Sequence, residues 1–107
     1  MTARHRFELI YAPQVKKQLR AIERKYYPLI CDTVETQLLF EPHVETRNRK
    51  PLKQPVEWGA EWEIRFGPDN RFRVFYAVES DKKQVFILAI GVKKGKILLI
   101  GGEEVEI

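Results

Sequence analysis

Apolar residues in the first forty positions follow two different periods. Residues 6–11 alternate between polar and apolar side chains, which predicts a first strand. Apolar side chains then recur every three or four residues in two runs, separated by Tyr27-Pro28 and ended by Glu41-Pro42. The two runs are Val15, Leu19, Ile22 and Tyr26, then Ile30, Val34 and Leu38. This pattern predicts two amphipathic helices joined tightly as an αα-hairpin.

The second half of the chain returns to a period of two. Residues 62–66, 71–78 and 85–92 are predicted as strands, and residues 97–100 as a further short one. The segment Gly67-Pro68-Asp69-Asn70 predicts a turn, because proline presets φ while glycine and asparagine tolerate positive φ. The layout predicts an α+β fold, in which the helical hairpin packs on one face of a mostly antiparallel sheet. The opposite face is then free to carry polar side chains.

Composition narrows the class of protein. A length of 107 residues, with 44% hydrophobic and 32% charged, fits one globular domain over residues 1–107. No apolar run approaches the ~20 residues of a membrane span, and the first residues do not resemble a signal peptide. The single cysteine, Cys31, falls on a predicted helix and is expected to be a buried structural thiol. Two histidines and no metal-ligand spacing lead us to expect no metal and no cofactor, in a cytoplasmic protein.

Charge is unevenly distributed along the chain. The formal net charge is +4, and the pI is about 9.3. The segment Arg47–Lys53 carries four positive charges and no negative one, whereas residues 103–107 carry three acids. Clustered positive charge favours a polyanion partner. Charge complementarity also leads to the hypothesis that the acidic end folds back on the basic face and competes with such a partner.

The period of two decides which side chains reach the outer face of the sheet. Those expected to point outward from the first two strands of the second half are Glu61, Glu63, Arg65, Arg71, Arg73 and Phe75. Guanidinium groups bind phosphate oxygens in pairs, and an aromatic ring such as Phe75 stacks on a base. An ordinary solvated face, with Glu63 paired to Arg71 or Arg73, explains the same pattern. Periodicity leaves both interpretations open, while Tyr76 is predicted in the core with its hydroxyl hydrogen-bonded.

Further basic residues are expected to rim this face. They belong to the segment 47–53 and to the turn that follows the strand 85–92. The candidates for binding phosphate are Arg49, Lys50, Lys53, Arg71 and Lys94, with Phe75 as the aromatic member.

Four short segments occur in a distinctive order. They are Asn48-Arg49-Lys50-Pro51-Leu52-Lys53, Trp62-Glu63-Ile64-Arg65-Phe66-Gly67, Arg73-Val74-Phe75-Tyr76 and Val85-Phe86-Ile87-Leu88-Ala89-Ile90-Gly91. In this order, and across nearly the whole chain, they resemble the RelE/ParE-type toxins of bacterial toxin–antitoxin pairs. The resemblance implies a curved sheet around helices and a cognate antitoxin as partner. For the RelE branch it also implies a metal-independent, ribosome-dependent endoribonuclease that cleaves mRNA, inhibits translation and leaves a 2′,3′-cyclic phosphate.

The same resemblance implies roles by motif position. The catalytic residues would be Glu63, Arg65, Arg73 and Lys93, with Arg73 binding phosphate and Lys93 or Lys94 supplying a cation after the central strand. Glu63 stands where one branch has a basic residue, and a carboxylate there would act as base. The C-terminal region, residues 97–103, departs from the RelE pattern because it holds no tyrosine or histidine. Two alternatives therefore stay open: a ParE-like toxin that inhibits DNA gyrase, and an inactive member that only binds its antitoxin.

Overall fold

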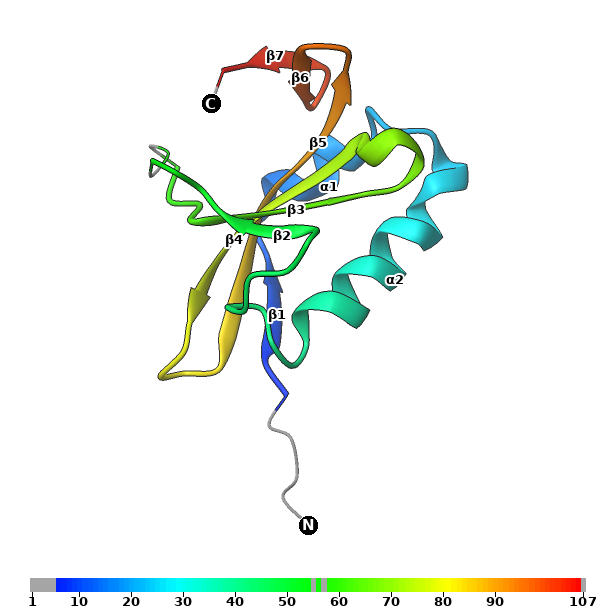
Figure 1. Ribbon diagram of the computed structural model, residues 1–107. Coiled ribbons are helices and arrows are strands. Elements are labelled where there is room, and N and C mark those ends of the chain that lie inside the picture. Colours follow the sequence, from blue (N-terminus) through cyan, green and yellow to red (C-terminus); the bar gives the residue numbers. More distant parts are fainter. Residues whose placement is uncertain (1–5, 55, 57, 107) are drawn as a thin grey trace.

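The computed structural model describes residues 6–54, 56 and 58–106, and within them seven strands form one sheet. The sheet order is β2-β3-β4-β5-β6-β7, and β1 pairs in parallel with β5 (Figure 1). The strands are β1 (Glu8–Tyr11), β2 (Arg49–Pro51), β3 (Trp62–Phe66), β4 (Phe72–Glu79), β5 (Gln84–Lys94), β6 (Ile97–Ile100) and β7 (Glu103–Val105). The helices are α1 (Gln14–Leu19) and α2 (Tyr27–Leu38), with the 3-10 turns η1 (Arg24–Tyr26) and η2 (Pro68–Asn70). The predicted α+β fold is confirmed.

Strand β5 organises the sheet. One of its edges pairs with β4 along the whole length of β4, and two partners share its other edge. Strand β1 pairs with Gln84–Ile87 of β5, and β6 pairs with Gly91–Lys94. Glycine is needed where β6 approaches, because a Cβ on Gly91 would lie 2.9 Å from the carbonyl oxygen of Leu99. The β6–β7 hairpin therefore extends from the far end of β5 (Figure 1).

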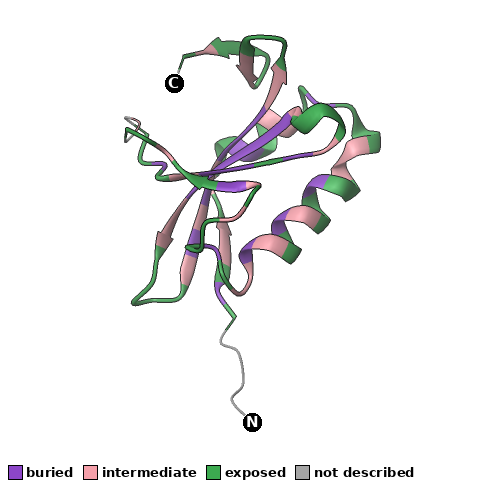
Figure 2. Cartoon of the chain, in the orientation of Figure 1, coloured by how far each residue is buried: buried purple, intermediate pink, exposed green. Residues whose placement is uncertain are grey.

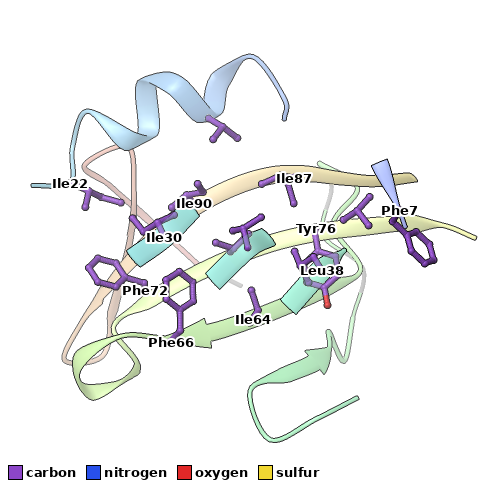
Figure 3. Close-up of a cluster of buried hydrophobic side chains, with 14 residues drawn as sticks. Phe7, Ile22, Ile30, Leu38, Ile64, Phe66, Phe72, Tyr76, Ile87 and Ile90 are labelled. Carbon is purple, nitrogen blue, oxygen red and sulfur yellow. The ribbon is translucent and has the colours of Figure 1, made fainter. Parts of the chain in front are cut away.

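The main core lies between one face of this sheet and the two helices. It joins the apolar sides of α1 and α2 to the inward residues of β3, β4 and β5 (Figures 2 and 3). Tyr76 is fully buried there, and its hydroxyl donates a 2.7 Å hydrogen bond to the carbonyl oxygen of Pro42, as predicted. The alternation in β4 placed Phe72, Val74 and Tyr76 on this face correctly.

The helical layer differs from the prediction in two ways. The first helix was expected to run to Tyr26 but ends at Leu19, where the Tyr27 hydroxyl donates a 2.6 Å hydrogen bond to the Leu19 carbonyl oxygen. The apolar spacing continues past that end because Ile22 still packs on the core from a turn. The prediction of a buried Cys31 is wrong, since the thiol is exposed. One residue along a helix is a rotation of roughly 100°, which turns Cys31 away from the core beside buried Ile30.

Two short strands were not predicted. Strand β2 lies inside the basic segment and pairs antiparallel with β3. Strand β7 follows a turn in which Gly101 and Gly102 have φ of 63° and 84°, so the acidic end of the chain continues the sheet. Among the described helices, none has the length and apolar character of a membrane-spanning segment.

Candidate functional site

A groove of about 1500 Å³ lies on the face of the sheet opposite the main core. Residues of β3 and β4 line it, together with residues of β2, of the loop after β2 and of the β5–β6–β7 end of the sheet. The charged side chains that line it are Glu45, Arg47, Lys50, Lys53, Glu63, Arg65, Arg73, Lys93, Lys96, Glu104 and Glu106. Because the cations come from several strands, only the folded chain brings them together.

Strand register explains why the central residues share this face. Arg65 on β3 lies directly opposite Arg73 on β4, and Glu63 lies opposite Phe75. Directly paired residues in an antiparallel sheet point to the same side. Lys50 on β2 is in turn opposite Glu63, so one row across the sheet carries a lysine, a carboxylate and an aromatic ring.

The two arginines converge on one carboxylate. Arg65 Nε donates a hydrogen bond to Glu63 Oε1, and Arg73 Nη1 reaches the same oxygen at 3.4 Å. Arg73 Nε donates to the Asn70 carbonyl oxygen at 3.1 Å, which fixes the guanidinium. Glu63 and Arg73 are 7% and 8% exposed, whereas the Arg65 side chain is 50% exposed. A buried, paired carboxylate thus sits beside one guanidinium that faces solvent.

Burial affects the pKa of Arg73. It lowers that pKa from its ordinary value, and the positive charge of Arg65 acts in the same direction. The Glu63 carboxylate acts oppositely by favouring the charged guanidinium. Breaking that pair would leave a buried charge without compensation, so these side chains depend on one another.

Other predicted residues divide between two surfaces. Lys50, Lys53 and Lys93 line the groove, and Lys50 Nζ also lies 3.2 Å from Glu45 Oε2. Arg71 and Lys94 instead line a smaller pocket of about 180 Å³, together with residues of α1 and η1. Arg71 has helical φ and ψ of −72° and −27° and precedes β4, so strand alternation does not apply to it. Lys94 follows Lys93 by one residue on β5 and therefore points to the other side.

Arg49 does not lie on the groove. Its side chain is buried, and Nη1 donates a hydrogen bond to the carbonyl oxygen of Gln37 in the last turn of α2. A cation at a helix C-terminus stabilises the unpaired carbonyl groups and the helix dipole. Its Nε has no partner within the described residues. The interpretation of Arg49 as an exposed phosphate-binding residue is wrong, because the β2 register turns the side chain toward the helices.

Phe75 points toward the groove but is not accessible. It is fully buried in a second cluster with Ala60 and Ala89, on the outer face of the sheet. The expectation that its ring is available to stack on a base is wrong. Trp58, from the loop before β3, packs edge-on against it and lines the groove instead. Sequence reasoning missed Trp58 because the loop has no period that assigns its residues to a face.

The chemistry available in the groove is that of carboxylate, guanidinium and ammonium groups. Within the described ranges, no three His, Cys, Asp or Glu side chains gather closely enough to hold a metal ion. A carboxylate accepts a proton, and guanidinium and ammonium groups stabilise negative charge on phosphate oxygens. The protein is therefore a small α+β domain with a basic groove, at the centre of which lies the buried ion pair of Glu63 and Arg73.

The chain was compared with models of known protein families. The chain matches the family model described as the ParE toxin of type II toxin–antitoxin systems over residues 9–95. It therefore belongs to that toxin family. A search of curated proteins finds no match.

A solved structure supports the fold. The chain is similar to one in the crystal structure of the toxin–antitoxin complex RelBE2 from Mycobacterium tuberculosis, with a TM-score of 0.66. Sequence identity is 18%, and the match covers 82% of this chain and 92% of the other. The architecture of helices on one face of a curved sheet is thus shared with a toxin–antitoxin protein of distant sequence.

Proposed function

We propose that this toxin is a metal-independent endoribonuclease that cleaves mRNA on the ribosome and inhibits translation. The observation that carries the proposal is the buried Glu63 carboxylate, held on the floor of a basic groove between Arg65 and Arg73. A carboxylate buried only to stabilise a fold has no need of an open groove lined by further cations.

The proposed reaction is attack by a ribose 2′-hydroxyl on the adjacent phosphate. Glu63 takes the proton from the 2′-oxygen as that oxygen bonds to phosphorus. Arg65 and Arg73 stabilise the negative charge that develops on the non-bridging oxygens. The bond from phosphorus to the 5′-oxygen breaks, and the Lys93 ammonium gives that oxygen a proton. The products are a 2′,3′-cyclic phosphate and a free 5′-hydroxyl, and exchange with water restores both side chains.

The proposed partners follow from the family and the fold. The structural neighbour was solved as a toxin–antitoxin complex, which supports a cognate antitoxin for this chain as well. The groove cations support contact with mRNA and ribosomal RNA, because Lys and Arg side chains neutralise phosphates irrespective of sequence. Both partners fit a protein that acts in the cytoplasm.

The test is induction of the toxin without antitoxin, followed by mapping of mRNA 5′ ends on ribosomes. New ends should appear with the wild type and disappear with Arg65→Ala/Arg73→Ala and with Glu63→Gln. Lys93→Ala and Lys94→Ala are a matched pair, because adjacent lysines of one strand point to opposite faces. Lys93→Ala should reduce cleavage strongly and Lys94→Ala only slightly. Unchanged cleavage in the double arginine variant, with the fold intact by circular dichroism, rejects the proposal.

The second candidate is inhibition of DNA gyrase, favoured by the match to the ParE family model. It predicts DNA-damage signalling and co-purification with gyrase while transcripts stay intact. Growth arrest that persists in Glu63→Gln, with no new mRNA ends in the wild type, would favour this candidate. A chain that binds its antitoxin and causes no growth arrest would be the inactive alternative.

A further inference from the structure

Trp58 is an exposed aromatic side chain in the groove. It is 37% exposed, although tryptophan is among the most apolar of the large side chains. It lines the same groove as Glu63 and Arg73. Its ring is therefore open to a bound molecule at the place where the proposed chemistry occurs.

The ring is held from behind. Its centroid lies 5.5 Å from that of Phe75 at an interplanar angle of 88°, an edge-to-face contact. Phe75 in turn is fully buried against Ala60 and Ala89. Trp58 lies in a turn that is closed by a 3.0 Å hydrogen bond from the Gly59 amide to the Val56 carbonyl oxygen. Gly59 has a φ of +92°, a conformation that favours glycine. The ring is thus presented in a defined orientation, so less entropy is lost when something packs on it.

The sheet sets the position of Phe75, the residue that supports the ring, relative to the charged residues. The supporting Phe75 is directly opposite Glu63 and two residues from Arg73 on β4. Two residues along a strand span about 7 Å. The Trp58 ring packs 5.5 Å from the Phe75 ring, so the aromatic surface lies beside the strand that carries Arg73. An aromatic surface in the same groove as two guanidinium groups suits a single strand of RNA, in which phosphates alternate with bases.

We propose that Trp58 is a stacking surface for an unpaired base of the RNA whose phosphate is held by Arg65 and Arg73. This inference rests on the proposed function, because it names how that site holds its substrate. Stacking tolerates any base, since every base has a π face. Trp58 therefore supplies affinity and position, and the guanidinium groups select the phosphate to be cut.

The purely structural alternative is that Trp58 only shields Phe75 from water. Substitution by leucine distinguishes the stacking role from the structural role. Leucine still covers the apolar surface of Phe75 but has no π face, whereas phenylalanine keeps one. Binding is measured by anisotropy of a labelled short single-stranded RNA with 2′-O-methyl groups, which cannot be cleaved through the 2′-oxygen. Trp58→Leu should weaken binding about 5- to 150-fold, the range expected for one stacked base, and Trp58→Phe much less. An oligonucleotide of the same length without bases should bind the wild type and Trp58→Leu equally.

A second measurement reads the ring directly. The chain has two tryptophans, so Trp62→Phe leaves Trp58 as the sole indole fluorophore. RNA that contains bases should quench this fluorescence, and the abasic strand should not. Equal affinity of wild type and Trp58→Leu for RNA, or equal quenching by the two strands, overturns the stacking role. Quenching by antitoxin or gyrase but not by RNA also overturns it, in favour of a protein-binding surface.

The controls keep the two proposals apart. If Arg73→Ala weakens RNA binding and Trp58→Leu does not, the nuclease site stands and stacking alone fails. If the wild type binds no RNA in either assay and cleaves none on ribosomes, the proposed function itself fails. Lys94→Ala, whose side chain lines the other pocket, is the control and should change RNA binding only slightly.

Discussion

The buried pair of Glu63 and Arg73 leads to an asymmetric prediction for stability. Glu63 pairs with two guanidinium groups, those of Arg65 and Arg73. Among the described residues, Arg73 pairs with one carboxylate, that of Glu63. Glu63→Ala leaves the Arg73 charge buried and uncompensated, which costs about 3–5 kcal/mol of unfolding free energy. Arg73→Ala leaves the Glu63 carboxylate still bonded to Arg65, so the expected cost is smaller, about 1–3 kcal/mol. Arg65→Ala removes a half-exposed partner and should cost about 0.2–1 kcal/mol.

The double variant Glu63→Ala/Arg73→Ala measures the coupling. Neither charge then remains buried alone, so its cost should fall below the sum of the two single variants by about 2 kcal/mol. The assay is urea denaturation followed by circular dichroism, with equal m-values confirming that the variants unfold over the same surface. Glu63→Gln, which keeps a hydrogen-bond acceptor, replaces Glu63→Ala if the latter does not fold.

The reasoning fails if the single costs add to within about 0.5 kcal/mol, as they do for independent sites. It also fails if Arg73→Ala is the more damaging single variant. Additive costs would mean that Glu63 is solvated and that the carboxylate and guanidinium groups form ordinary surface pairs. The geometry on which the nuclease proposal rests would then be absent in solution.

Further predictions concern the core, the basic segment and the acidic end. Tyr76→Phe should lower the unfolding free energy by about 1–3 kcal/mol in urea and leave RNA affinity unchanged. Because burial raises the pKa of Tyr76 above its ordinary 10.0, the unfolded chain loses this proton first, and above about pH 10 the wild type should lose stability faster than the variant. Arg49→Ala should lower the melting temperature without changing the salt dependence of RNA binding, whereas Lys50→Ala should weaken binding and reduce the salt slope by about 0.7. Glu104→Gln/Glu106→Gln should tighten RNA binding most at low salt, and equal affinities there would exclude competition by the acidic strand.

The alternation of side chains predicted much of the architecture. The period of two along β3 and β4 placed Ile64, Val74 and Tyr76 in the core and Glu63, Arg65 and Arg73 on the other face. This succeeds because a sheet with one face packed on helices permits one register, and a slip by one residue would bury the charged set. The fold is therefore encoded in local pattern at the strands that matter for the site.

Alternation failed where the backbone is not extended or where another segment covers the strand. Arg71 was assigned by period to a strand that begins one residue later, after a turn containing Asp69 and Asn70 with φ of 55° and 51°. Arg49 was expected on the rim of the outer face, but the pairing of β2 with β3 turns its side chain toward α2. Contacts of this kind depend on tertiary structure, and the periodicity within either segment does not specify them.

Phe75 and Trp58 show how the same limit applies to function. The period gave the correct face for Phe75 but not the depth, because depth is decided by what the loop before β3 places on top of it. Trp58 covers Phe75 and is itself accessible from the groove. The ring that was expected to stack is therefore buried, and a different aromatic ring faces the groove. A candidate site read from strand period alone therefore names the right surface and the wrong contact residue wherever a loop folds over the sheet. The Trp58→Leu and Trp58→Phe measurements test this substitution of one ring for another.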